Sequence, residues 1–138
     1  MMKKTAIAAA LIAMSGAACA TTDGNSEASE EVAARLAEFE PTGETTACVN
    51  LTRIRSIDPL DDYRFLVRTG VNDYYLNEVS GRCNGAARAG NRLQYTTSTG
   101  QLCRNEIIEV VDNLAGFTVG SCGLGTFQEL AKKPEEAE

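Results

Sequence analysis

The stretch from Ile54 to Val79 constrains the fold most, because apolar residues, turn formers and β-formers there all indicate one local structure. Asp58-Pro59 begins a turn, and Tyr63–Thr69 then alternates between two faces, as a strand does. Gly70–Asp73 supplies residues that tolerate a positive φ, and Tyr74–Val79 returns antiparallel. The stretch therefore predicts a three-stranded meander at the centre of a small sheet.

The rest of the domain carries further short β-prone runs with turn residues between them. These runs lie at 47–57, 92–97, 102–111 and 116–120. Ser80–Asn91 is a long Gly- and Ala-rich connection, and Ser121–Gly125 is expected to be a glycine-dependent turn. The pattern predicts an all-β domain of about six or seven antiparallel strands, arranged as a small barrel or a sandwich.

The N-terminus predicts export. Lys3 and Lys4 precede a short apolar run, and small residues follow it, so residues 1–18 are expected to be a signal peptide. Small residues before Cys19 favour a lipoprotein signal, with Cys19 acylated after cleavage. The alternative is ordinary cleavage after Ala20, which would remove Cys19. The sequence thus predicts a protein anchored by lipid to the outer membrane and facing the periplasm, or else a soluble periplasmic protein.

Four segments follow from these observations. After the signal peptide, residues 19–44 are expected to form an acidic tether with a short helix at 30–39, capped by Ser29. The β domain is expected at 45–130. Residues 131–138 are expected to be a disordered acidic tail.

The charge is concentrated in the flanks of the chain. Removing residues 1–18 leaves 11 basic and 19 acidic side chains, while residues 45–127 hold eight of each. Acidic runs of this kind usually keep a segment solvated. This balance argues against a nucleic-acid partner.

Four cysteines remain when Cys19 is set aside, and in an exported domain with a small core they are expected to form disulfides. Three pairings are possible. We favour Cys48 with Cys122, which would close the first strand on the last, and Cys83 with Cys103, which would pin the long connection. Of these two pairs, loss of Cys48–Cys122 is expected to be the more damaging, because it would close the longer loop.

Short motifs around these cysteines give the chain a family resemblance. They include Cys48-Val-Asn-Leu, Leu102-Cys-Arg and Ser121-Cys-Gly-Leu-Gly. With them, residues 46–130 resemble a family of small exported bacterial proteins that is catalogued only as a domain of unknown function. The resemblance implies a fold and a compartment but no activity, catalytic residue or cofactor.

The chain has no histidine, which removes the commonest general base and metal ligand, so catalysis would depend on carboxylates or thiols. Asp58, Asp61 and Asp62 lie close enough in sequence to hold a hard cation, and a cation-dependent or carboxylate-based hydrolase is the alternative function. Their spacing lacks the pattern of a dedicated calcium loop, so turn formation is the simpler interpretation. The cysteines contain no C-x-x-C pair, which argues against zinc. We expect no catalytic residue, metal or cofactor.

Residues 80–105 contain four arginines and no acid, namely Arg82, Arg88, Arg92 and Arg104. Guanidinium groups suit phosphates and carboxylates, so this stretch predicts a non-enzymatic binding or structural module that presents an arginine-bearing loop to an anionic ligand. An anionic glycolipid or an envelope protein would be a suitable partner. Tyr74, Tyr75 and Tyr95 are candidates to line a groove. The oligomeric state does not follow from the sequence.

Overall fold

A computed structural model describes residues 28–134 and shows one short helix and ten strands. The helix α1 spans Glu30–Leu36. The strands are β1 (Phe39–Thr46), β2 (Cys48–Asn50), β3 (Ser56–Pro59), β4 (Arg64–Arg68), β5 (Asp73–Glu78), β6 (Asn91–Gln94), β7 (Gln101–Cys103), β8 (Ile107–Asp112), β9 (Thr118–Gly123) and β10 (Phe127–Lys132). A 3-10 turn, Leu51–Arg53, separates β2 from β3. The expected leader, the acylated Cys19 and the end of the tail lie outside the described residues.

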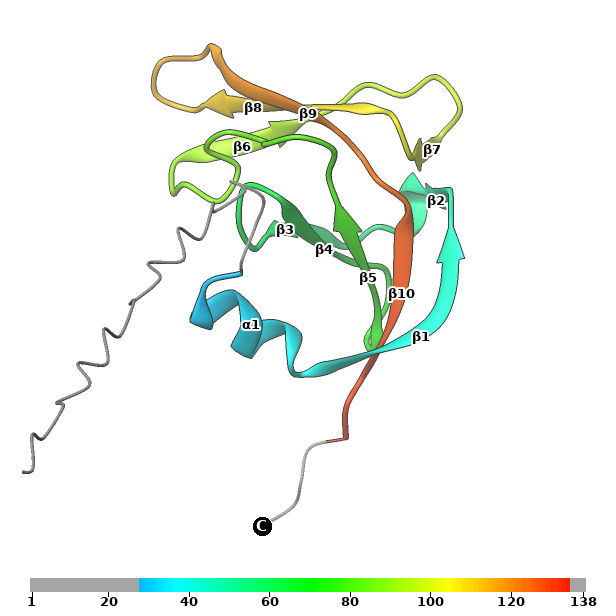
Figure 1. Ribbon diagram of the computed structural model, residues 1–138. Helices are drawn as coiled ribbons and strands as arrows, with labels where there is room; N and C mark the ends of the chain where they lie inside the picture. The colour runs from blue at the N-terminus through cyan, green and yellow to red at the C-terminus, as the bar shows by residue number, and fades with distance from the viewer. Residues whose placement is uncertain (1–27, 135–138) are drawn as a thin grey trace, which may run out of the picture.

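The strands form three antiparallel sheets, which confirms the all-β prediction. A five-stranded sheet has the order β1-β10-β5-β4-β3, a three-stranded sheet has the order β6-β8-β9, and β2 pairs with β7. Figure 1 shows the three-stranded sheet above the five-stranded one, with α1 on the opposite side of the latter. Within residues 28–134 the sheets do not close into a barrel.

The predicted three-stranded meander forms, but Asp58 and Pro59, which were expected to begin its first turn, are the last residues of β3, and the turn lies at 60–63. β3 pairs with β4 and β4 with β5, in the registers Ile57↔Val67 and Val67↔Tyr75. Alternation along β4 places Phe65 and Val67 in the core between the sheets, whereas Leu66 joins a second cluster on the other face. Both faces of this strand are thus buried at its centre.

The two faces of the five-stranded sheet are named here by what covers them. The inner face points toward the three-stranded sheet, and its core contains twelve buried residues, including Phe65, Phe127 and Ile108. The outer face carries a smaller cluster of four buried residues, which are Phe39, Leu66, Tyr74 and Leu130. The hydrophobic core therefore lies mainly between the two larger sheets.

The sheets are joined on one side through the connection from β9 to β10. There the buried side chain of Asn77 donates to the Gly125 carbonyl oxygen and accepts from the Gly125 amide, both at 2.8 Å. A Cβ at Gly125 would overlap the backbone oxygen of Glu78, so the close passage of the chain requires glycine. β3 and β6 are terminal strands of the five-stranded and three-stranded sheets, respectively.

The N-terminal boundary of the β domain differs from the expected position at residue 45. β1 begins at Phe39 and pairs with β10 up to Lys132, so part of the expected tether and of the expected tail belongs to the sheet. The helix also ends at Leu36 rather than at residue 39. Pro41 and Gly43 favour a break in the sequence, but β1 is an edge strand with a register shift between Pro41 and Thr45, where both residues are tolerated.

The number of strands also exceeds the expected six or seven, because β1 and β10 form where no strand was expected and one expected strand is divided in two. The run 102–111 is split by a turn in which Asn105 has φ 69°, giving β7 and β8. Ser121–Gly125 was expected to be a turn, but its first three residues continue β9. A strand that contains several glycines has the same residue types as a glycine-rich turn. Composition could not distinguish the two, so the turn prediction for this segment was wrong.

The disulfide pairing predicted from the sequence is wrong. All four cysteines are bonded, but Cys48 pairs with Cys103 and Cys83 pairs with Cys122. The first pair lies directly opposite in the β2–β7 register. The second forms because the segment after β5 lies along β9, with Ser80 bridging Gly123. The first and last strands, β1 and β10, are joined by backbone pairing, so no disulfide is needed to hold them together.

Candidate functional site

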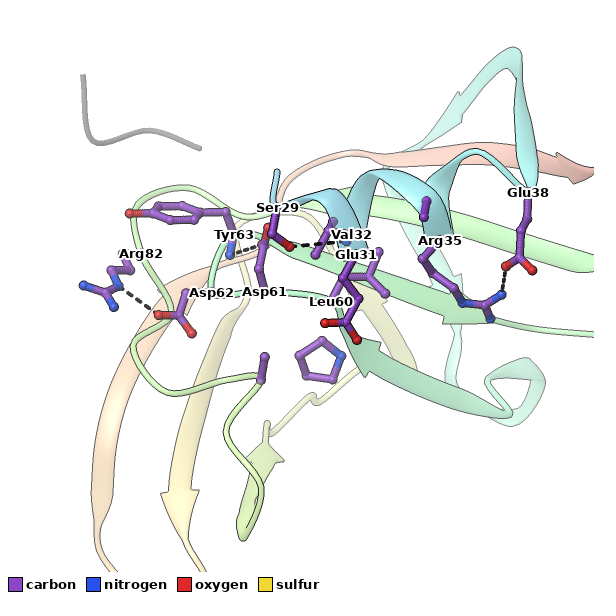
Figure 2. A pocket seen from close by; sticks show the side chains of 13 residues that line it. Ser29, Glu31, Val32, Arg35, Glu38, Leu60, Asp61, Asp62, Tyr63 and Arg82 are labelled. Atoms are coloured by element: carbon purple, nitrogen blue, oxygen red, sulfur yellow. Dashed lines mark hydrogen bonds and ion pairs between the residues drawn. The ribbon is translucent and has the colours of Figure 1, made fainter. Parts of the chain in front are cut away.

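One groove lies between α1 and the turn that joins β3 to β4. It is open to solvent and has a volume of about 1120 Å³. We call it the α1 groove. Figure 2 shows α1 along one side of it and Asp61, Asp62 and Arg82 on the other. Its ionisable lining residues are Glu31, Arg35, Glu38, Asp61, Asp62, Tyr63 and Arg82.

Both side-chain oxygens of Asp61 in the α1 groove have partners within the β3–β4 turn. Oδ1 accepts from the Tyr63 amide at 2.8 Å, and Oδ2 pairs with the Arg64 guanidinium at 2.7 Å. Aspartate commonly stabilises a turn by accepting from the backbone two residues on. Asp61 therefore acts as a turn residue, and Arg64 neutralises its charge.

The other two candidate carboxylates are bound elsewhere. Asp62 pairs with Arg82 at 2.9 Å, and this hydrogen bond raises the pKa of Arg82 above its ordinary value. Asp58 accepts from the Ser56 hydroxyl at 3.1 Å. Within residues 28–134, no three Cys, Asp or Glu side chains are grouped so that they could hold a metal ion. Asp58, Asp61 and Asp62 thus have separate partners and do not form a common site.

The second groove lies between the terminal strands β3 and β6. Its volume is about 380 Å³, and we call it the edge groove. Its apolar lining includes half-buried side chains that pack against the main core, namely Ile54, Ile57, Leu93 and Tyr95. Ser56, Pro59, Ala86 and Asn91 complete it with two arginines.

The charged side chains of the edge groove are Arg55 and Arg92, both exposed, and no acidic residue lines it. Arg55 comes from the segment before β3, and Arg92 comes from β6, so the two sides of the groove each contribute one guanidinium. Arg92 Nη1 donates to Asn113 Oδ1 at 2.7 Å, which orients it. An apolar floor between two cations can accept an anionic group attached to an apolar one.

The structure does not gather the four arginines predicted as one loop. Arg82 is in the α1 groove, Arg92 is in the edge groove, and Arg88 lies on the connection before β6, where its charge acts on Asp112. Arg104 follows β7 and lies near the start of β8, whereas Arg92 pairs with Val111 near the end of β8. The predicted cluster depended on a Cys83–Cys103 bond, and the observed pairing does not make it.

Arg55 was missed as a site residue, and only one of the three candidate tyrosines lines either groove. Arg55 is far in sequence from the acid-free stretch, so no local pattern links it to Arg92. Tyr74 packs on Phe39 with a ring separation of 4.8 Å, and Tyr75 contacts Phe127 edge-on. Tyr95 lines the edge groove.

Three carboxylates also approach one another on β1, β10 and β5. Hydrogen bonding to Glu44 raises the pKa of Glu129, and the charges of Glu44 and Asp73 act in the same direction. Repulsion between neighbouring carboxylates favours the protonated form of one of them. This group is a source of pH-dependent stability rather than a ligand site.

Comparison with known proteins gives a family and no activity. Residues 28–134 contain no helix with the length and apolar character needed to cross a membrane. No curated protein and no solved structure matches the chain. The model of one protein family matches residues 2–134, and the chain therefore belongs to the family of unknown function DUF6491.

Proposed function

We propose that this protein is a non-enzymatic binding module of the bacterial cell envelope, and that it holds an anionic ligand or the anionic surface of a partner in the edge groove. One observation carries the proposal. Arg55 and Arg92 flank an apolar groove that no acidic side chain lines.

Two guanidiniums on opposite sides of a groove suit an anion with several oxygens. Each guanidinium can offer two parallel N–H donors to a phosphate or carboxylate. Ile57, Leu93 and Tyr95 supply apolar surface beneath them, which favours a ligand whose anionic group is joined to an apolar part. An anionic glycolipid or phospholipid has this chemistry, and so does an acidic segment of a protein.

The remaining candidate chemistry supports binding rather than catalysis. Asp61 and Asp62 form ion pairs with arginines, and all four cysteines of the domain are in disulfides. A general base or nucleophile needs an accessible lone pair and a partner that activates it. These carboxylates and sulfurs hold the structure together instead.

The compartment is part of the same proposal. Two disulfides are characteristic of proteins in oxidising compartments, and the leader-like residues 1–18 favour export. We propose that Cys19 is acylated and holds the domain at the periplasmic face of the outer membrane. Intact mass of the protein from its native membrane fraction, with and without reduction, tests this anchor directly.

The groove is tested with a small anionic amphiphile. Dihexanoyl phosphatidylglycerol is titrated below its micelle concentration into isotopically labelled protein, and the amide shifts of Leu93 and Tyr95 are followed. The variant Arg55→Gln/Arg92→Gln is expected to weaken binding more than tenfold, because two charge-assisted contacts are lost. The matched control, Arg53→Gln/Arg104→Gln, removes two exposed arginines outside the groove and is expected to bind like the parent.

Three results would contradict this proposal. Dihexanoyl phosphatidylcholine could bind as tightly as the anionic lipid, the two arginine variants could weaken binding equally, or the amide shifts could fall outside the edge groove. Melting temperatures of both variants are measured in parallel and are expected to stay close to that of the parent, because Arg55 and Arg92 are exposed.

A further inference from the structure

The turn that joins β8 to β9 exposes two large apolar side chains. Leu114 is 98% exposed and Phe117 is 62% exposed. Single exposed apolar residues are common on protein surfaces, but two on one short turn form a small apolar projection. We call residues 112–118 the hairpin tip; Figure 1 shows it projecting beyond the end of the three-stranded sheet.

The hairpin tip is an ordered turn. Asp112 Oδ1 accepts from the amides of Leu114 and Ala115 at 2.8 and 3.0 Å, and these bonds lower the pKa of Asp112. The Gly116 amide donates to the Asp112 carbonyl, and Gly116 has φ 77°. Leu114 and Phe117 are therefore exposed in a turn whose conformation is held by hydrogen bonds. The carboxylate of Asp112, the one acidic residue of the tip, is directed at the turn's own backbone.

Arginines lie at the base of the tip. Arg92 donates to Asn113 Oδ1, and the charge of Arg88 acts on Asp112. The Asn113 amide also donates to the Gly90 carbonyl at 3.0 Å, which fastens the tip to the connection that carries Arg88. Apolar side chains thus project beyond a base that has two guanidiniums and one internally bonded carboxylate.

This arrangement complements an anionic lipid surface. Apolar side chains enter the boundary between headgroups and acyl chains, while arginines just behind them meet the phosphates. Arg92 belongs both to the base of the tip and to the edge groove. A bilayer contacted by the tip would therefore lie beside the groove.

We propose that the hairpin tip docks on the surface of an anionic phospholipid bilayer through Leu114 and Phe117, and so presents the edge groove to lipid headgroups. The inference rests on the proposed function, since it names the headgroup as the ligand class of that groove. The two apolar residues of the docking contact, Leu114 and Phe117, do not line the groove.

A fluorescent label at the tip tests the contact. The full chain carries Cys19→Ser, so that no acyl group anchors it, and Leu114→Cys is labelled with an environment-sensitive dye. Vesicles of phosphatidylglycerol and phosphatidylcholine are expected to shift its emission to the blue, whereas pure phosphatidylcholine is expected to have little effect. The control is Val71→Cys, since Val71 is 78% exposed on the β4–β5 turn. No shift at position 114, or an equal shift at position 71, would overturn the proposal.

Unlabelled variants separate this inference from the groove. Leu114→Ser/Phe117→Ser is expected to reduce sedimentation with anionic vesicles at least tenfold and to leave binding of the soluble amphiphile unchanged. Undiminished vesicle binding would overturn the docking proposal. Loss of amphiphile binding in Arg55→Gln, with vesicle binding kept, is the expected result for a groove residue. If Arg55→Gln instead leaves amphiphile binding intact, the groove function fails and the tip contact stands.

A second copy of the chain is the other occupant that the experiment can detect. Sedimentation velocity without vesicles is expected to show the same species for the parent and for Leu114→Ser/Phe117→Ser. A dimer that these substitutions dissociate would assign the tip to self-association and overturn the lipid proposal.

Discussion

The inner and outer faces of the five-stranded sheet are stabilised in different ways. The inner face shares twelve buried residues with the elements opposite it, including both sulfurs of the Cys83–Cys122 bond. The outer face has four buried residues, and beside it lies a helix of seven residues whose one buried side chain is Val32. The edge groove borders the first region and the α1 groove borders the second.

This difference affects what each groove can do. The α1 groove is bounded by surface ion pairs between near neighbours, such as Arg35–Glu38, and such pairs contribute little to stability. The edge groove is bounded by strands whose apolar side chains pack into the disulfide-linked core. Its geometry is therefore held by the same interactions that fold the domain, and its arginines have no acid beside them in the lining.

The largest expected effect concerns the disulfide on the inner face. Cys83→Ala/Cys122→Ala removes a cross-link between residues 39 positions apart, which contributes about 4 kcal/mol in the chain-entropy model. Cys48→Ala/Cys103→Ala opens a link across 55 positions and carries a similar entropic term. Since Cys83 is fully buried and Cys122 is 6% exposed, their removal also leaves poorly filled core space. Urea unfolding is expected to show the larger loss for Cys83→Ala/Cys122→Ala.

An equal or larger loss in Cys48→Ala/Cys103→Ala would mean that the short β2–β7 pair, rather than the inner core, limits stability. The same variants sharpen the groove comparison. Ala86 belongs to the same core as Cys83, its amide donates to the Cys83 carbonyl oxygen, and it lines the edge groove. We expect Cys83→Ala/Cys122→Ala to weaken amphiphile binding as well.

A smaller effect is expected on the outer side. Val32→Ala removes two methyl groups from a side chain that is 6% exposed, which should lower the free energy of unfolding by about 1.5 kcal/mol. Urea unfolding measures this loss, with exposed Ala33→Ser on the same helix as the control. Amphiphile binding by the edge groove should not change. Weaker binding in Val32→Ala would show that the two regions are coupled.

The smallest effect concerns the carboxylates of Glu44, Glu129 and Asp73. Because the pKa of Glu129 is raised in the folded state, the folded protein releases this proton at a higher pH than the unfolded chain does. Stability therefore falls as the pH rises through the folded pKa, and the penalty is fully present above it. Glu129→Gln is expected to raise the melting temperature slightly at about pH 7 and to have no such effect at about pH 3.

Exposed Glu40→Gln on β1 serves as the control for this substitution. An increase in melting temperature that is the same at both pH values would show that the carboxyl charge of Glu129 is not its cause.

The sequence predicted those parts of the fold that depend on local pattern. The meander from β3 to β5 could be recognised because turn residues at Asp61-Asp62 and Gly70 separate its β-prone runs, although Asp58-Pro59, expected to begin the first turn, ends β3 instead. β1 could not, because Pro41 and Gly43 are signals of a break unless a neighbouring strand is known to tolerate them at an edge. Pairing with β10 in the tertiary structure makes that segment a strand.

The candidate site shows the same division. Arg92 was identified because it lies in an acid-free stretch with four arginines. Tyr95 was identified as an aromatic residue that could line a groove. Arg55 could not be linked to them, because the two sides of the edge groove are brought together only when the two larger sheets pack. Nothing local in the sequence marks an exposed arginine as one side of a groove.

The sequence alone determined that the domain is all-β and that four cysteines would be oxidised, because both properties depend on composition and short-range periodicity. The tertiary structure decided which cysteines pair, where the sheet begins and which arginines share a groove. These outcomes depend on strand order and register. Many arrangements of the same strands satisfy the local preferences, and only the packing of the core selects one of them.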